Sequence, residues 1–509
     1  MPRKHRTSKD SALLAAALLV AVGGLIYELI LGTAATYIFG DSITSFSLAT
    51  GISLFGMGIG SWISYRFTSN PGNNFAKNEI VLAVIGGNSV LLLFAAFSFT
   101  PLAWLVFVLL SLAIGICIGI EIPLLIAMYK KYAGKSGARV VGKVLSLDYF
   151  GALIGSLLFP FVLLPYLGLS RTAYAVAILN LLVALYILKN IKTSQRLISL
   201  AVLSLIVLGG SFVYASRVEQ VIDSRSYNDP VVYYDLSPYQ KIVVTQYKKD
   251  TRLYLNNQLQ FSSLDEHRYH ETLAHSALSA IDQPKNVLIL GGGDGLLARE
   301  VLRYPSVENI DIVDIDPAVT RLASTVPLIT ALNDNSIQNP KVHVYNQDAF
   351  QYVRNTDTTY DAVLSDLVDP SNERIAKLYS VEFYRKIPNI LSPSGVFATQ
   401  ASSTFFTPDA FSTINTTLQT ALPQYTTKPI GINVPSFGEW GFILASKNAI
   451  DFSTAQLPSG LAYLTTEELL HAENSAQIQA VVSRPAKPST LLSPKVIYQY
   501  KKNMSQWSY

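Results

Sequence analysis

Cysteine is nearly absent from this chain of 509 residues, and the single one, Cys117, lies inside an apolar run. One cysteine excludes an intrachain disulfide and a zinc site built on several thiolates. Charged residues are also scarce, at 15% of the chain, whereas half of all residues are hydrophobic and the mean hydropathy is +0.31. Such a chain is too apolar for one soluble globule, and its length predicts two or three domains.

The scarcity of charge, and of acids above all, is confined to the first half. Residues 1–216 carry 15 Lys and Arg against 6 Asp and Glu, a net charge of +9, whereas the remainder carries 24 against 29, a net charge of −5. A domain boundary is therefore predicted near residues 216–229. The acidic second half favours cationic ligands and argues against a nucleic-acid partner, whose phosphates attract the opposite charge.

Long apolar runs fill the first half, and seven of them can cross about 30 Å of hydrocarbon as helices. They are roughly residues 11–39, 43–64, 80–99, 102–128, 144–168, 172–188 and 197–215. A signal peptide is disfavoured for the first run, which is too long and is followed by more spans. The first half is therefore predicted to be a multi-pass domain of the cell (inner) membrane, with the lipid bilayer as its partner.

The loops between these runs alternate in charge. One set of loops holds fourteen basic residues: Arg3, Lys4, Arg6, Lys9, Arg66, Lys77, Lys130, Lys131, Lys135, Arg139, Lys143, Lys189, Lys192 and Arg196. The opposite set holds Arg171 alone, so the positive-inside rule predicts a cytoplasmic N-terminus. Seven crossings then put the second half outside, which conflicts with an enzyme that uses a cytoplasmic nucleoside. Either one run does not cross, or the charge count misleads, or the domain faces outward; a fifth span broken around Pro160 and Pro165 is one candidate for a re-entrant segment.

Three carboxylates lie within the predicted spans, with no Lys or Arg deep in the same helices: Glu28, Glu121 and Asp148. Acids in lipid are costly and are candidates for function, so a cation-binding or transport role is considered for Glu28, near mid-span. Asp148 lies near Lys143 and fits an interface position, and Glu121 fits a hydrogen bond to a neighbouring helix. A glycine set on the second run predicts close helix packing: Gly51, Gly56, Gly58 and Gly60.

Residues 285–303 of the second half, KNVLILGGGDGLLAREVLR, predict a buried strand, a glycine-rich turn and a helix. Its glycines, Gly291 and Gly293 among them, let the backbone approach a ligand. The next strand, IDIVDID, leads to Asp314, twenty residues after Asp294, a spacing typical of an acid that binds ribose hydroxyls.

Two further predicted strands also end in acids. KVHVYNQDAF leads to Asp348, and YDAVLSDLVDP leads to Asp366 and Asp369. Ligands of an open parallel sheet bind at the carboxyl ends of its strands, so the acids that follow these four strands are expected to meet in one cleft. The alternative, that each acid is a helix N-cap or a turn residue, explains one acid better than four in register.

The ligand expected there is an S-adenosyl compound rather than a dinucleotide. GGGDG puts a carboxylate where a pyrophosphate needs backbone amides and no negative charge, whereas an acid suits a sulfonium or an amine. A metal is disfavoured, since His267, His270 and His275 have helical spacing and no cysteine nearby.

Four segments together resemble the spermidine synthase (polyamine aminopropyltransferase) family: SPYQKIVV, DEHRYHETLAHSAL, LILGGGDGLLAREVLRYPSVENIDIVDIDP and SDLVDPSN. The resemblance spans about residues 230–447, and GLIYELILG and LDYFGALIGSLLFPF in the first half are similar to the membrane-bound bacterial branch of that family. It implies transfer of the aminopropyl group of decarboxylated S-adenosylmethionine, a co-substrate, to a small cationic amine such as putrescine, giving spermidine and methylthioadenosine. The sulfonium is a good leaving group, so no metal is required.

The resemblance also implies roles for single residues. Those at positions that contact the nucleoside or the aminopropyl group are Gln240, Tyr269 and His270. Asp294 is the acid of the GGGDG loop, Asp314 the ribose acid and Asp348 the acid near the adenine. Asp366 is the base for the attacking amine, and Asp369 fixes the cationic substrate.

Two sites depart from the family pattern. Asn256-Asn257 replaces a common Asp-Gly pair, and Phe437 replaces a tyrosine near the amine, which removes one hydrogen-bond partner. Two alternatives therefore stay open: an S-adenosylmethionine methyltransferase, and a transporter or sensor in which a degenerate synthase domain binds polyamines.

The expected architecture is a multi-pass α-helical membrane domain followed by an α/β Rossmann-like (S-adenosylmethionine methyltransferase-type) domain with a small N-terminal β subdomain. The expected limits are 1–215 for about seven transmembrane helices, 216–284 for a linker and the β subdomain, 285–450 for the catalytic domain and 451–509 for a C-terminal extension. A homodimer is also considered.

Overall fold

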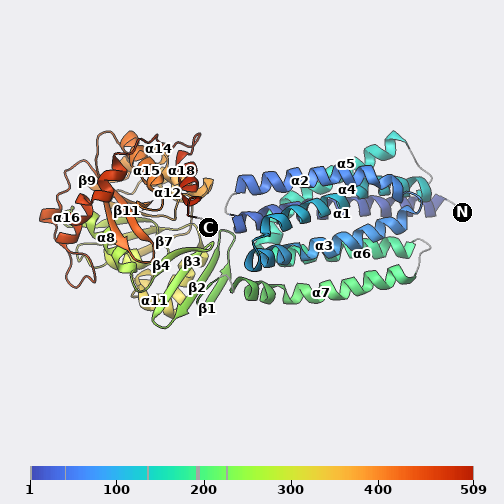
Figure 1. Cartoon of the computed structure of the whole chain (residues 1–509), viewed down its shortest axis with the longest axis horizontal. Helices are drawn as coiled ribbons and strands as arrows, with labels where there is room; N and C mark the ends of the chain where they lie inside the picture. Colours follow the sequence, from blue (N-terminus) through green and yellow to red (C-terminus); the bar gives the residue numbers. More distant parts are fainter. Residues whose placement is uncertain (1–2, 40–41, 134–136, 191–194, 225–226, 508–509) are drawn as a thin grey trace. The chain divides into compact units, whose positions relative to one another are not determined.

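The computed structural model describes residues 3–39, 42–133, 137–190, 195–224 and 227–507. The chain forms two compact units, Met1–Asn228 and Asp229–Tyr509, which are called the helical unit and the enzymatic unit below (Figure 1). The division between the units lies at the end of the predicted boundary region, residues 216–229, because the last helix of the helical unit continues to Ser224. Of the charged loop residues counted above, Lys135 and Lys192 lie outside the described residues.

The helical unit consists of α1 (Arg3–Phe39), α2 (Ser42–Ile63), α3 (Pro71–Phe99), α4 (Ala103–Met128), α5 (Ala138–Leu158), α6 (Leu164–Asn190) and α7 (Gln195–Ser224). Among the described residues, six helical segments are long and apolar enough to cross a membrane. The longest, Ala138–Asn190, has 53 residues and contains both α5 and α6. The seven predicted runs therefore correspond to seven helices in six segments.

The break between the fifth and sixth runs lies at a glycine. The chain stays helical through Pro160 and Pro165, because a π-helical turn over Phe159–Leu163 joins α5 to α6. Gly168 has φ 71°, a left-handed conformation that glycine adopts without a Cβ clash. The backbone of the fifth run thus breaks at Gly168, three residues after Pro165, and whether this segment is re-entrant stays a prediction.

Helices α2 and α4 approach closely where glycines leave room. A Cβ at Gly60 would lie 2.1 Å from the carbonyl oxygen of Ile116, and one at Gly56 would lie 2.7 Å from that of Leu112. A Cβ at Gly51 or Gly58 would meet no atom within 4 Å. The predicted close packing is confirmed for two of the four glycines and is wrong for the other two.

The enzymatic unit begins with a four-stranded antiparallel sheet of β1 (Val231–Leu236), β2 (Lys241–Tyr247), β3 (Asp250–Leu255) and β4 (Gln258–Ser262). Asn256 and Asn257 form the turn between β3 and β4 with φ values of 49° and 66°. Two consecutive positive φ values are what a tight hairpin turn requires, and asparagine tolerates them. The departure from Asp-Gly at this turn therefore leaves the hairpin intact.

A seven-stranded sheet forms the centre of this unit. Its order is β10-β11-β9-β8-β5-β6-β7. The strands are β5 (Asn286–Gly291), β6 (Asn309–Val313), β7 (Val342–Tyr345), β8 (Tyr360–Asp366), β9 (Leu391–Ser403), β10 (Thr426–Val434) and β11 (Gly438–Ser446). Strands β5 to β9 are parallel, and β10 and β11 pair antiparallel at one edge. The predicted Rossmann-like, methyltransferase-type fold is confirmed.

Helices cover this sheet and carry the connections: α8 (Glu266–Leu278), α9 (Leu296–Val301), α10 (Pro317–Thr325), α11 (Pro327–Leu332), α12 (Ala349–Asn355), α13 (Glu373–Ala376), α14 (Val381–Tyr384) and α15 (Pro408–Ala421). Residues 451–509 contain α16 (Thr466–Asn474), α17 (Ala476–Val482) and α18 (Lys495–Met504). Ile478 of α17 and Val496 of α18 belong to the same buried cluster as Phe411 of α15. The predicted C-terminal extension is thus part of the catalytic fold.

Candidate active site

A cavity of about 460 Å³ lies at the carboxyl ends of the parallel strands of the enzymatic unit. All the residues predicted for the site within this unit line it: Gln240, Tyr269, His270, Gly291, Gly293, Asp294, Asp314, Asp348, Asp366, Asp369 and Phe437. The four strand-end acids meet in one place because the parallel strands end at the same edge.

The glycine-rich turn brings the ends of three strands into contact. Gly291 has φ 81°, and a Cβ there would lie 2.0 Å from the carbonyl oxygen of Asp366. The amide of Gly293 donates to Oδ2 of Asp314 at 3.2 Å, and a Cβ at Gly293 would lie 2.5 Å from that oxygen. Burial raises the pKa of Asp314 to about 7. The turn therefore depends on glycine at both positions.

Asp294 is a half-buried carboxyl that lies between groups of opposite charge. Its Oδ1 accepts a hydrogen bond from the amide of Leu296 at 2.9 Å. Burial raises its pKa to about 6, the nearby His270 opposes this rise and the nearby Asp366 adds to it. Such a group changes its charge easily when a cation enters the cavity.

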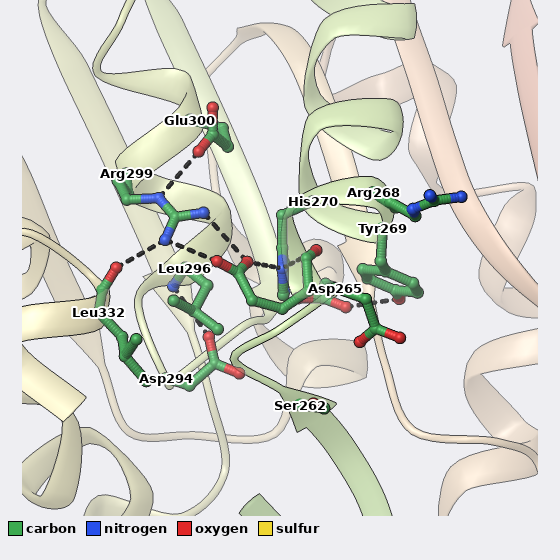
Figure 2. Close-up of polar contacts among 12 residues, drawn as sticks. Ser262, Asp265, Arg268, Tyr269, His270, Asp294, Leu296, Arg299, Glu300 and Leu332 are labelled. Atoms are coloured by element: carbon green, nitrogen blue, oxygen red, sulfur yellow. Dashed lines mark hydrogen bonds and ion pairs between the residues drawn. The ribbon is translucent and has the colours of Figure 1, made fainter. Parts of the chain in front are cut away.

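A buried ion network supports this wall of the cavity (Figure 2). Arg299 donates to both carboxylate oxygens of Glu266, at 2.8 and 3.0 Å, and Nδ1 of His270 lies 2.7 Å from Oε2 of the same carboxylate. Burial opposes both charges, but the contact with Glu266 raises the pKa of His270 to about 9. The contacts with His270 and Arg299 lower the pKa of Glu266 to about 2, against the effect of burial. His270 is thus a fixed cation at neutral pH.

The two acids of the loop after β8 have different hydrogen-bond partners. The hydroxyl of Tyr269 donates to Oδ1 of Asp366 at 2.7 Å, and burial raises the pKa of Asp366 against the effect of His270 and of this bond. The hydroxyl of Ser402 donates to Oδ1 of Asp369 at 2.5 Å, and burial raises the pKa of Asp369 to about 6. Both carboxyls therefore hold a proton more tightly than an exposed aspartate does, which suits an acceptor of protons.

Asp348 caps a helix as well as lining the cavity. Its Oδ1 accepts hydrogen bonds from the amides of Phe350 and Gln351 at the start of α12, and its Oδ2 forms an ion pair with Lys377. The bond to Lys377 lowers the pKa of Asp348 although burial opposes this. Asp348 is thus both a helix N-cap, as the alternative predicted, and a residue of the cavity wall.

Gln240 reaches the same cavity from the loop before β2. Its Nε2 donates to Oδ2 of Asp316 at 3.0 Å, so a second carboxylate of the β6 end holds the amide in place. Asp316 was not among the predicted residues, although it is the last residue of the IDIVDID segment. Its other oxygen caps α10 by accepting from the amide of Ala318.

An aromatic wall lies at the other end of the cavity. Phe437 packs against Tyr269, with ring centroids 6.3 Å apart, and against Trp440, at 5.2 Å. The sequence prediction missed several residues of this end: Ser403, Phe406, Thr407, Trp440, Tyr500 and Met504. Trp440 is three residues from Phe437, so its place in the cavity could have been predicted from the sequence. Tyr500 lines the cavity only because of tertiary packing, which no local pattern predicts.

The three acids predicted in the spans lie in the helical unit and do not belong to this cavity. Glu28 and Asp148 are partly exposed, whereas Glu121 is 3% exposed. Glu121 lies beside a fourth acid, Glu79, which is fully buried. Glu79 was missed because the predicted span began at residue 80, whereas α3 begins at Pro71.

Comparison with known proteins gives a consistent result along the chain. Residues 266–454 match the family model described as the spermine/spermidine synthase domain. The polyamine aminopropyltransferase of Oceanobacillus iheyensis is 38% identical over 493 residues, which cover 95% of this chain and 96% of that protein. That of Leptospira interrogans is 40% identical over 466 residues, covering 90% and 92%. A crystal structure of spermidine synthase in complex with the transition state analogue AdoDATO has 24% sequence identity and a TM-score of 0.46, covering 50% of this chain and 88% of that one.

The two relatives align over nearly the whole length of the chain, the helical unit included. This agreement favours aminopropyl transfer over the methyl transfer that the fold alone also allowed. The chain belongs to the polyamine aminopropyltransferase (spermidine synthase) family and is an enzyme of polyamine biosynthesis.

Proposed function

We propose that the cavity binds decarboxylated S-adenosylmethionine together with a diamine such as putrescine, and that it forms spermidine and methylthioadenosine. The observation that carries this proposal is the placement of Asp366 and Asp369 on one loop, in the cavity that Asp294 and Asp314 also line. Four half-buried carboxyls in one cavity suit two cationic substrates and would repel a phosphate.

The nucleoside occupies the end formed by the glycine-rich turn. Asp314 accepts hydrogen bonds from the ribose hydroxyls, and the backbone at Gly291 and Gly293 lies against the ligand because no Cβ intervenes. Asp348 and its partner Lys377 lie at the adenine. Asp294 faces the positive charge of the sulfonium or of the aminopropyl ammonium group.

The reaction is a direct displacement. The amine nitrogen attacks the aminopropyl carbon that is bonded to the sulfonium, a C–N bond forms as the C–S bond breaks, and methylthioadenosine leaves as a neutral thioether. The proton of the attacking amine passes to Asp366, whose carboxyl is held by the hydroxyl of Tyr269. Asp369 holds the cationic acceptor in line with the carbon under attack.

The purified full-length chain tests this proposal. Incubation with decarboxylated S-adenosylmethionine and putrescine is expected to release spermidine and methylthioadenosine in equal amounts, measured by liquid chromatography. Release of S-adenosylhomocysteine from intact S-adenosylmethionine would favour a methyltransferase. Binding of spermidine without turnover would favour the transporter or sensor.

We further propose that the helical unit spans the cell membrane and that the chain is of the membrane-bound branch of its family. Its six apolar helical segments are long enough, and large apolar side chains are exposed along α2, α4, α5 and α7, among them Phe55, Leu105, Leu153 and Ile206. The fourteen basic loop residues against one favour a cytoplasmic N-terminus. Extraction from membranes by detergent, but not by high salt or alkaline carbonate, is the expected result.

The side of the enzymatic unit follows from the number of crossings. If all seven helices cross, this unit lies on the face opposite to the N-terminus. Fusions of alkaline phosphatase, active only outside, and of a fluorescent protein, active only in the cytoplasm, to the C-terminus decide the side. Light scattering of the detergent-solubilised protein tests the homodimer, which rests on the resemblance alone.

A further inference from the structure

A helix outside the matched family region forms part of the cavity wall. The family model matches residues 266–454, whereas α18 covers Lys495–Met504. Tyr500 and Met504, one helical turn apart on α18, both line the cavity. Tyr500 is only 7% exposed. The C-terminal segment therefore completes the wall of the cavity.

Several contacts fix α18 in this place. Val496 and Ile497 pack into the main hydrophobic core. The side chain of Asn503 accepts a hydrogen bond from the amide of Asp409 at 3.0 Å and donates one to its carboxylate at 3.2 Å. Just beyond the helix, Trp507 donates to the carbonyl oxygen of Phe406 at 3.2 Å. The position of Tyr500 is thus set by packing and hydrogen bonds on both sides.

The hydroxyl of Tyr500 is directed at one of the two loop acids. It hydrogen-bonds to the carboxyl of Asp369, which also has Ser402 and Gln400 as partners. The same cavity has an aromatic wall, where Phe437 and Trp440 pack against each other. Asp369 and these aromatic rings thus line one cavity, and Tyr500 supplies it with a hydroxyl where Phe437 has none.

We propose that Tyr500 is a positioning residue for the acceptor amine, acting through Asp369, and that α18 completes the part of the site that selects the acceptor. This proposal rests on the proposed function. An ammonium group on an aliphatic chain is recognised by a carboxylate and by aromatic faces together, which are what this end of the cavity offers. The chemical class that fits is an aliphatic diamine, with one amine reacting and the other end held in the wall.

The substitution Tyr500→Phe removes only the hydroxyl, and Tyr498→Phe is its matched control. Tyr498 lies on the same helix with 64% of its surface exposed. Loss of a hydrogen bond to a charged group is expected to raise the KM for putrescine about tenfold or more. The KM for decarboxylated S-adenosylmethionine stays unchanged, and Tyr498→Phe matches the wild type in both constants.

The pH profile separates positioning from a structural effect. Burial raises the pKa of Asp369 to about 6, and the bond from Tyr500 lowers it. Without that bond the pKa rises further, so the acid limb of kcat/KM for putrescine moves to higher pH in Tyr500→Phe and stays in place in Tyr498→Phe.

Two results would overturn the role of Tyr500. One is a Tyr500→Phe enzyme with the KM and acid limb of the wild type, and the other is an equal rise in KM for both substrates. Wild-type turnover, measured first as methylthioadenosine release, tests the proposed function separately. If the wild type turns over and Tyr500→Phe is indistinguishable from it, only the role of Tyr500 fails.

Discussion

The two units bury acidic side chains in opposite ways. In the enzymatic unit each deeply buried glutamate has several partners. Glu266 is bound by Arg299 and His270, Glu300 by His275 and Arg299, and Glu271 accepts hydrogen bonds from three successive backbone amides, at 2.7 to 2.9 Å. These charges are compensated where they lie, so they fix α8 and α9 behind the cavity.

In the described part of the helical unit the buried acids lack cationic partners. Glu79 and Glu121 lie beside each other and hydrogen-bond to each other, and Asn78 is a further partner of Glu79. The buried hydroxyl of Tyr27, which lies near both acids, has no hydrogen-bond partner among the described residues. Two buried acids without a cation cost free energy, so they do not stabilise the helices around them. Substitutions of the buried acids are therefore expected to change the free energy of unfolding in opposite directions in the two units, and by different amounts.

The largest effect is expected for Asp366→Asn. It removes the proton acceptor and keeps the size of the side chain, so kcat falls by roughly 10²- to 10⁴-fold. The asparagine oxygen still accepts from Tyr269, and the unfolding temperature is expected to stay unchanged. Methylthioadenosine release measures the rate, and Asp282→Asn in an exposed loop is the control. A loss of less than tenfold would assign the base to another group.

The next largest effect is expected for Arg299→Met, which removes the cation from the buried network. Glu266 then stays buried with His270 alone, and breaking a buried pair in this way costs about 3–5 kcal/mol of stability. The control is Lys285→Met, which breaks the pair with Glu308 whose members are 58% and 65% exposed, and no measurable change is expected there. Thermal unfolding of the full chain measures both. Equal unfolding temperatures for the two variants would show that the network does not hold the fold together.

The sequence could place the strand-end acids but not this network. Asp314 and Asp366 follow apolar strands, and the rule that parallel strands end at one edge brings them together without knowledge of any contact. Arg299 and Glu266 are 33 residues apart and meet only because α8 packs beside α9, so no local pattern marks them. The same holds for Tyr500, which lies outside every motif.

In the helical unit, apolar runs identified the helices but not their starts. Hydropathy begins to rise at residue 80, whereas a proline at the first helical position starts α3 at Pro71 and brings Glu79 into the bundle. The prolines did not mark the break exactly, because the π-helical turn accommodates Pro160 and the helix is interrupted at Gly168. The backbone conformation at Pro71 and at Gly168 thus determines where these helices begin and where they break.

A smaller effect concerns the pH dependence of stability. Glu266 has a pKa lowered from 4.5 to about 2, so its contribution is present above pH 4.5 and is lost as the pH falls towards 2. His270 has a pKa raised from 6.5 to about 9, so its contribution is present below pH 6.5 and is lost as the pH rises through 9. The difference in unfolding temperature between wild type and Glu266→Gln is therefore expected to be largest between pH 4.5 and 6.5. A difference independent of pH would show that Glu266 acts through packing alone.

The smallest effect on stability is expected for the two buried glutamates of the helical unit. Glu79→Gln and Glu121→Gln keep the volume of each side chain and remove a buried carboxyl that has no cationic partner to lose. The free energy of unfolding of the detergent-solubilised protein is therefore expected to change by less than about 1 kcal/mol, with a gain in stability the expected sign. Kinetic constants for both substrates stay at wild-type values, because neither acid lines the cavity. Glu266→Gln, the same chemical change in the enzymatic unit, is expected to lower the unfolding temperature clearly. A large loss of stability from Glu79→Gln would contradict the contrast, since it would mean that the acids of the helical unit are compensated as those of the enzymatic unit are.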